Sequence, residues 1–116
     1  MSYPPPEAGD IVVVDFDPAR GTEQQGTRPA LVISATLFNA SGHRSIVCPV
    51  TRNAQEWPTK VKLPDGCGAT GYVLADQVRS VDRLSRGFRK IGHAPPETVD
   101  AVRRKIIGLF SDKPVV

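Results

Sequence analysis

The sequence has no hydrophobic run near the ~20 residues that a membrane-spanning helix needs, which argues against an integral helical membrane protein. Residues 1–7 include neither a basic start nor an apolar stretch, so no secretory signal peptide is expected there. No repeat, low-complexity tract or second domain is visible in the 116 residues, of which only 6% are aromatic. These absences predict one soluble domain with its own core, and cytoplasmic residence as the default.

Cysteine and histidine are scarce as well. Cys48 lies in an apolar run and Cys67 in a glycine-rich stretch, and two cysteines in a cytoplasmic chain are expected to be free thiols. His43 and His93 are 50 residues apart and flanked by turn residues, so we expect both to be solvated. Because the chain lacks paired Cys or His spacings, the sequence gives no support for a zinc site.

Charge is distributed unevenly along the chain. The net charge is +3, but residues 1–78 carry six basic and eight acidic side chains, whereas residues 79–116 carry nine and four. Ten of the 15 positive charges are arginines, whose planar fork suits anion recognition. The asymmetry is compatible with a nucleic acid or an acidic protein partner and does not separate the two.

The spacing of apolar residues predicts several short strands. The first run is apolar enough for a strand buried on both faces, whereas a later one alternates polar and apolar residues. Residues 38–42 have the composition of a turn, and the proline-rich residues 1–8 are expected to be extended and flexible. The predicted strands are residues 11–16, 29–34, 45–50, 60–63, 71–76 and 88–91.

The last part of the chain changes to helical spacing. Pro95, Pro96 and Glu97 form a favourable helix start, and apolar residues then recur every three or four positions. Short strands followed by one amphipathic helix predict a mostly β fold: a small antiparallel barrel in a single domain, capped by a C-terminal α-helix.

A polar loop joins the first two predicted strands and ends at Arg28 and Pro29. Two glycines let its backbone approach a ligand closely, and Pro29 limits Arg28 to extended conformations. A permanently charged planar donor at the foot of such a loop suits a phosphate or carboxylate ligand. The alternative is that Arg28 pairs with Asp15 or Asp17 and that the loop is only scaffold.

Three other places carry candidate side chains. The hydroxyl of Thr51, at the end of the third predicted strand, could donate to a phosphate oxygen or merely satisfy a turn. Asp76 and Gln77 could read base edges, hold Arg28 or cap a turn. Trp57, the only tryptophan, could stack on a base or cover an edge of the core. No histidine lies near the loop, so a two-histidine ribonuclease arrangement is not evident.

Four sequence motifs occur in a fixed order along the chain: D-x-D-P at residues 15–18, E-Q-x-G-x-R-P at 23–29, V-C-P-V-T at 47–51 and L-A-D-Q-V-R-S at 74–80. With these motifs and the terminal helix, the chain resembles the MazF/PemK family of toxin endoribonucleases. The likeness runs from about residue 9 to residue 110, and the order of the pieces makes coincidence improbable.

The resemblance implies an SH3-like barrel over residues 9–112, preceded by a flexible segment over residues 1–8, working as a homodimer. It implies the toxin of a type II toxin–antitoxin system, inhibited by a MazE-like antitoxin with an acidic tail. The activity implied is sequence-specific cleavage of single-stranded RNA without a metal or other cofactor.

Site residues also follow from the resemblance. Arg28 and Thr51 match the catalytic arginine and threonine of the family. The positions that line its RNA site are matched by Thr22, Glu23, Gln24, Asp76 and Gln77. One branch of the family has a histidine in place of Thr22 and an arginine in place of Leu74, both tied to catalysis, so this chain fits the version that relies on Arg28 and Thr51.

The residues suit a reaction in which RNA supplies its own 2′-hydroxyl nucleophile and leaves a 2′,3′-cyclic phosphate and a 5′-hydroxyl. Arg28 and Thr51 would stabilise the charge that develops on the phosphate, and Glu23 or Asp76 would take the 2′ proton. Two rivals remain open. A gyrase poison of the CcdB type relies on a C-terminal tail with tryptophan, whereas here no aromatic residue follows Phe110. The other rival is a non-catalytic RNA-binding module.

Overall fold

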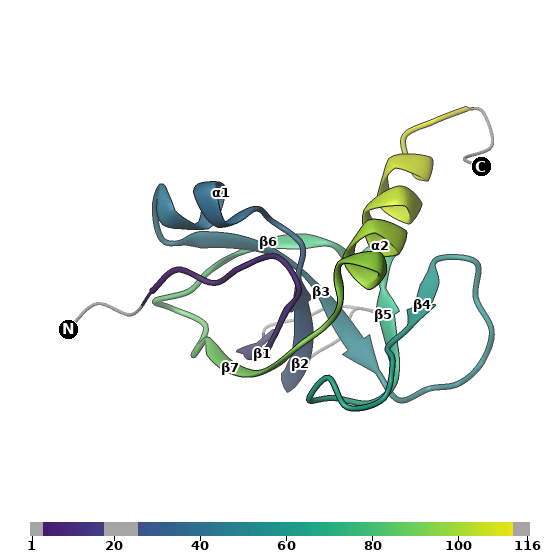
Figure 1. Ribbon diagram of the computed structural model, residues 1–116, viewed down its shortest axis with the longest axis horizontal. Helices are drawn as coiled ribbons and strands as arrows, with labels where there is room; N and C mark the ends of the chain where they lie inside the picture. Colours follow the sequence, from purple (N-terminus) through teal and green to yellow (C-terminus); the bar gives the residue numbers. More distant parts are fainter. Residues whose placement is uncertain (1–3, 18–25, 113–116) are drawn as a thin grey trace.

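The computed structural model describes residues 4–17 and 26–112 of the chain. Seven strands precede a C-terminal helix, with two short helical segments between strands (Figure 1). In chain order the elements are β1 (Asp10–Asp15), β2 (Thr27–Val32), α1 (Thr36–Ala40), β3 (Arg44–Thr51), β4 (Lys60–Lys62), β5 (Tyr72–Leu74), the 3₁₀ turn η1 (Ala75–Gln77), β6 (Arg79–Asp82), β7 (Arg89–His93) and α2 (Pro96–Gly108).

All strand pairings are antiparallel. The strands follow the order β4-β5-β3-β2-β1-β7, and β6 pairs with the first half of β3. Figure 1 shows α2 standing beside β4. Helix α2 also contacts η1, and α1 contacts β3. The prediction of a mostly antiparallel β domain with a C-terminal helix is therefore confirmed.

The core has two parts, which lie on opposite faces of β1 to β3. Val12 and Val14 of β1 pack on one face, against residues of β2, β3 and β6. Ile11 packs on the other face, in a cluster that includes Val102 of α2. Because successive side chains of a strand point to opposite faces, burial on both sides requires the nearly continuous apolar run seen in the sequence.

The strand boundaries differ from the sequence prediction by one or two residues, and β6 was not predicted as a separate strand. Two of the differences have a clear structural cause. Residues 38–40 were predicted as part of a turn but belong to helix α1, because Asn39 is fully buried and needs partners. Its amide donates to the carbonyl groups of Pro6 (2.7 Å) and Ser34 (3.1 Å), which fixes a helical turn. The predicted fifth strand ends at Leu74 because η1 carries the chain across to pair β6 with β3.

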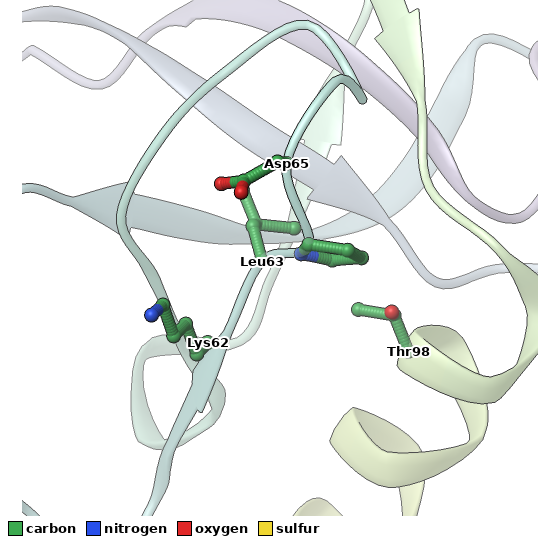
Figure 2. Close-up of a pocket in the computed structure, with 5 residues that line it drawn as sticks. Lys62, Leu63, Asp65 and Thr98 are labelled. Atoms are coloured by element: carbon green, nitrogen blue, oxygen red, sulfur yellow. The ribbon is translucent and has the colours of Figure 1, made fainter.

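A pocket of about 320 Å³ lies between the end of β4 and the start of α2 (Figure 2). It is lined by Lys62, Leu63, Pro64, Asp65 and Thr98. None of the residues predicted to bind RNA or to act in catalysis lines this pocket. Within the described residues, neither helix has the length and apolar character needed to cross a membrane.

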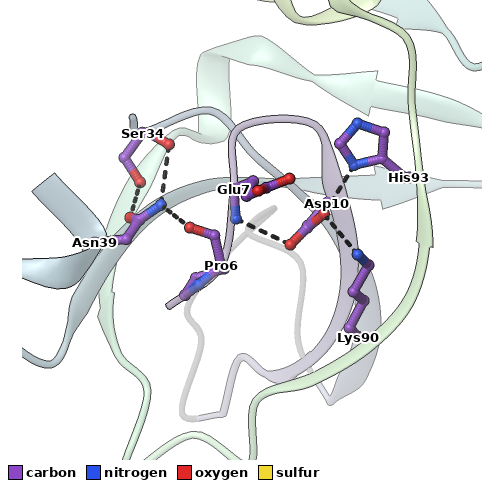
Figure 3. Close-up of polar contacts among 7 residues, drawn as sticks. All are labelled: Pro6, Glu7, Asp10, Ser34, Asn39, Lys90 and His93. Carbon is purple, nitrogen blue, oxygen red and sulfur yellow. Dashed lines mark hydrogen bonds and ion pairs between the residues drawn. The ribbon is translucent and has the colours of Figure 1, made fainter. Parts of the chain in front are cut away.

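Asp10 fastens the start of β1 to two other segments (Figure 3). Its side chain is only 4% exposed, accepts a hydrogen bond from the Glu7 amide (3.0 Å), and contacts His93 Nδ1 (2.8 Å) and Lys90 Nζ (3.2 Å). Burial alone would raise the pKa of Asp10, but these contacts outweigh burial and hold it below the ordinary value of 3.8.

The Asp10 contacts also bear on two predictions. His93 was expected to be solvated, and its side chain is 46% exposed, although one ring nitrogen binds the buried Asp10 carboxylate. Glu7 and Pro6 make hydrogen bonds although residues 4–8 form no helix or strand. The flexibility expected for residues 1–8 stays a prediction.

Both cysteines are free thiols, as predicted. Burial, with a smaller contribution from the charge of Asp76, raises the pKa of the Cys48 thiol to about 12, so this group is neutral and unreactive. Cys67 lies in the loop that crosses β7 at Gly92, where a Cβ atom would overlap the Cys67 carbonyl group. The absence of a side chain at Gly92 therefore allows the Cys67 carbonyl to accept a hydrogen bond from the His93 amide at 2.9 Å.

Candidate functional site

Strand β2 presents Arg28 at the end of the sheet. Arg28 pairs with Val14 of β1 and, by strand alternation, shares a face with Ala30 and Val32, which lie in the core beside Val14. The side chain is half-buried and takes part in interactions within the protein. Its guanidinium is therefore carried by a strand that is fixed by buried neighbours.

Thr51 ends β3, the strand on the other side of β2. The β2–β3 register ends at the pair of Ala30 and Pro49, so Arg28 and Thr51 each lie two residues beyond the last paired residue of their strand. By strand alternation, both are on the face that carries Ala30 and Pro49. Thr51 itself pairs with Tyr72 of β5, and the two predicted catalytic residues lie at the same end of neighbouring strands.

The Thr51 hydroxyl already has a partner. Its Oγ1 accepts a hydrogen bond from the Asn53 amide at 3.1 Å, so the expectation that it could satisfy a turn is confirmed. An accepted bond uses an oxygen lone pair and leaves the hydroxyl proton for donation. Thr51 is 7% exposed, so its orientation is held by its surroundings.

Trp57, in the loop before β4, and Asp76, in η1, are brought into contact. The indole Nε1 donates to Asp76 Oδ2 at 3.3 Å, and the Trp57 side chain remains 59% exposed. The alternative that Trp57 covers an edge of the core is therefore wrong. Lys60 Nζ binds the carbonyl groups of Asn53 (2.8 Å) and Gln55 (2.7 Å), which ties down the loop that runs from Thr51 to Trp57.

The structure gives less information about the remaining predicted site residues. Gln77 follows Asp76 in η1, is half-buried and takes part in interactions within the protein. Thr22, Glu23 and Gln24 lie outside the described residues. Among residues 4–17 and 26–112, no group of three or more His, Cys, Asp or Glu side chains is placed to hold a metal ion.

Two arginines at this end of the barrel were not singled out as site residues by the sequence analysis. The guanidinium carbon of Arg79, on β6, lies 5.6 Å from the centroid of the Phe16 ring, just beyond β1. Arg86, in the turn after β6, binds the carbonyl groups of Asp15 and Asp17. Arg79 belongs to the L-A-D-Q-V-R-S motif, whereas the sequence signal for Arg86 was the excess of arginine after residue 78, which indicates charge but not its location.

The carboxylates near Arg28 are engaged by backbone amides. Asp15 Oδ1 accepts from the Asp17 amide at 2.9 Å, and Asp17 Oδ1 accepts from the Gly26 amide at 2.8 Å. These bonds use one oxygen of each carboxylate to shape the chain between β1 and β2. The site therefore combines arginines, a hydroxyl and an exposed indole with an ordered backbone.

Comparison with known sequences identifies the family. The pattern of PemK-like, MazF-like toxins of type II toxin–antitoxin systems matches residues 7–110. The chain belongs to the PemK/MazF toxin family. Over 101 residues it is 39% identical to the endoribonuclease toxin MazF of Escherichia coli K12, covering 87% of this chain and 90% of that protein. The endoribonuclease toxin ChpB of the same strain is 41% identical over 100 residues, covering 81% and 84% of the two chains.

Solved structures agree with the family assignment. The crystal structure of MazF from Deinococcus radiodurans superposes with a TM-score of 0.87 at 40% identity, covering 94% of this chain and 98% of that one. In a crystal structure of the MazE–MazF complex from the same organism, the matched chain has a TM-score of 0.80 at 36% identity, with 97% and 100% coverage. The resemblance inferred from the motifs, and the MazF-like fold, are thus confirmed.

Proposed function

We propose that this PemK/MazF-family endoribonuclease toxin cleaves single-stranded RNA at short specific sequences by attack of the 2′-hydroxyl on the adjacent phosphorus. The products would be a 2′,3′-cyclic phosphate and a 5′-hydroxyl. The observation that carries the proposal is the β2–β3 register, which supports a site where Arg28 and Thr51 lie at the same end of neighbouring strands. The toxin domain would cover residues 9–112, with residues 1–8 as a flexible extension.

Arg28 and Thr51 would act on the charge that builds on the non-bridging oxygens during attack. Arginine offers a charged fork that can bridge two oxygens, and the threonine hydroxyl adds one neutral donor. The charged donor Arg28 would contribute ~3–4 kcal/mol, or roughly 10²- to 10³-fold in rate, and the neutral Thr51 hydroxyl would contribute less. Glu23 or Asp76 would accept the 2′ proton; arginine is a poor literal acid at neutral pH, so its role is electrostatic.

RNA would extend from Arg28 and Thr51 toward Trp57. An exposed indole offers a face on which a base can stack, and its bond to Asp76 fixes the ring while leaving that face open. Asp76 and Gln77 would contact base edges, together with Thr22 and Gln24.

Two protein partners complete the proposal. The apolar side chains of Ile107, Leu109 and Phe110 at the end of α2 are 62%, 45% and 85% exposed, which supports a homodimer that covers them. A monomer of 12.5 kDa seen by light scattering at micromolar concentration would contradict the dimer. A cognate antitoxin with an acidic tail would compete with RNA; simultaneous binding of RNA and antitoxin without mutual weakening would contradict that inhibition.

The rivals are a gyrase poison and a non-catalytic RNA-binding module. Incubation of the purified protein with a mixed RNA pool, followed by sequencing of the new 5′ ends, separates them. The proposal expects new 5′-hydroxyl ends at one short motif, formed in the presence of a metal chelator. Intact RNA recovered with the protein would favour the binding module, and inhibition of gyrase without RNA cleavage would favour the poison.

A further inference from the structure

The chain leaves β1 through residues 15–17 and enters β2 through residues 26–28. These two segments together are called here the loop mouth. The ladder between the two strands continues past Asp15, because the Phe16 amide donates to the Gly26 carbonyl at 3.0 Å. The next rung is closed by a side chain, since the Gly26 amide donates to Asp17 Oδ1 at 2.8 Å. Arg28 lies only two residues beyond Gly26.

Arg86 holds the loop mouth from the neighbouring turn. Its carbonyl accepts from the Asp15 amide at 2.9 Å. Its guanidinium Nη1 donates back to the carbonyl groups of Asp15 (3.4 Å) and Asp17. One residue thus satisfies three backbone groups at the point where β1 ends.

The turn that carries Arg86 is itself well fixed. The Asp82 carboxylate accepts from the Leu84 amide (3.0 Å) and the Ser85 hydroxyl (3.0 Å). On the far side of the turn, Arg83 donates to the carbonyl groups of Arg44 (2.7 Å) and Gly42 (2.8 Å). The turn therefore uses one arginine to hold the start of β3 and another to hold the end of β1.

From this arrangement we propose that Arg86 is a positioning residue for RNA cleavage, which acts by fixing the loop mouth and thereby the aim of Arg28. The inference rests on the catalytic role proposed for Arg28. Arg86 need not touch RNA, because all the bonds seen for its guanidinium go to backbone carbonyls. A small displacement of a catalytic group can cost about 10²-fold in rate.

The chain supplies a matched control. Arg83 lies in the same turn, is half-buried like Arg86 and also binds backbone carbonyls, but at the start of β3. Arg86→Met and Arg83→Met each remove one positive charge and one set of carbonyl bonds. A role in stability alone predicts similar effects for the two variants.

The experiment measures single-turnover cleavage at saturating RNA, RNA affinity at several salt concentrations, and thermal melting. Arg86→Met is expected to lower the cleavage rate by about 10- to 100-fold, with RNA affinity and its salt dependence within about 2-fold of the parent. Arg83→Met should keep the parental rate at temperatures where it is folded. Equal rate losses in the two variants, or a weaker salt dependence in Arg86→Met alone, would overturn the positioning role, the latter because it indicates a phosphate contact.

A double substitution separates this inference from the function on which it rests. If Arg86 acts through Arg28, adding Arg86→Met to Arg28→Ala should change the rate by less than about 2-fold, because the two are not independent. If the two rate losses multiplied in the double variant, Arg86 would not act through Arg28. An Arg28→Ala protein with the parental rate would refute the proposed function itself, whereas loss in Arg28→Ala with full activity in Arg86→Met refutes only the inference.

Asp17→Ala is the second variant, used if Arg86→Met does not fold. It deletes the acceptor of the Gly26 amide at an exposed position, so the fold should persist. Faster hydrogen exchange at the Gly26 amide together with a slower cleavage rate is expected. Unchanged cleavage with faster exchange would show that order at the loop mouth does not matter for catalysis.

Discussion

The two ends of β1 use acidic side chains in different ways. At the start of the strand, Asp10 is buried and receives the Glu7 amide, His93 and Lys90. At the other end, Asp15 and Asp17 lie nearer the surface and accept backbone amides.

The difference shows how one strand separates stability from chemistry. A buried carboxylate with partners all around it strengthens the fold but offers nothing to a substrate. The far end instead orders the backbone and carries Arg28, the residue proposed to bind the phosphate. Substitutions at the two ends should therefore change different measured quantities.

The largest effect is expected for Arg28→Ala. Cleavage should fall by at least about 10²- to 10³-fold, because the charged fork that faces the developing phosphate charge is lost. The melting temperature should stay close to that of the parent protein. Arg28→Lys should restore little, since lysine keeps the charge but not the fork. An active Arg28→Ala protein that melts well below the parent would make Arg28 part of the scaffold.

Measuring the RNA affinity of Trp57→Ala tests whether the exposed indole stacks on a base. Loss of one stacked base costs ~1–3 kcal/mol, so binding should weaken by about 5- to 150-fold. Trp57→Phe is the control, because it keeps an aromatic face while both variants lose the bond to Asp76. Equal weakening in the two variants would assign the effect to that bond instead of to stacking.

Asp10→Asn should affect folding and leave cleavage by the folded protein unchanged. Loss of charge-assisted bonds is expected to lower the free energy of unfolding by about 1–3 kcal/mol at neutral pH. Because the folded-state pKa of Asp10 lies below 3.8, its stabilisation is present above pH 3.8 and is lost as the pH falls through the folded-state value. Denaturant titrations from pH 7 to pH 2 should show parent and variant converging at the acidic end; a constant difference would contradict the assignment.

Thr51→Ala is expected to have the smallest effect. A neutral hydrogen bond contributes about 0.5–1.5 kcal/mol, so the cleavage rate should fall by about 2- to 10-fold. Thr51→Ser keeps the hydroxyl and should retain most of the rate. Equal losses in Thr51→Ser and Thr51→Ala would mean that the methyl group, which both variants lack, matters more than the donor.

Much of the barrel could be predicted because burial on both faces leaves a strong mark in the sequence. The nearly continuous apolar run of β1 and the helical spacing of α2 are such marks. Helix α1 could not be predicted, because it depends on Asn39 finding Pro6, 33 residues away. Local composition at residues 38–42 indicated only a turn.

The site was partly predictable for a similar reason. Arg28 and Thr51 belong to motifs, and their place at the same end of neighbouring strands follows once the β2–β3 register is known. Trp57 and Asp76 were both candidates, but their contact depends on how two loops fold. Arg86 was missed because it binds backbone carbonyls 69 and 71 residues away. Every residue has a backbone carbonyl, so the sequence does not reveal which ones an arginine binds.

The close crossing at Gly92 bears on how a cell could escape this toxin. Any side chain there would force the Cys67 loop away from β7 and break the bond from the His93 amide. Such a change would lower the amount of folded protein in the cell, while the residues proposed to contact RNA would be unchanged. In cells that survive expression of the toxin, Gly92 variants should therefore be present at low protein levels but be active per folded molecule. Arg28 variants should be present at normal levels and be inactive.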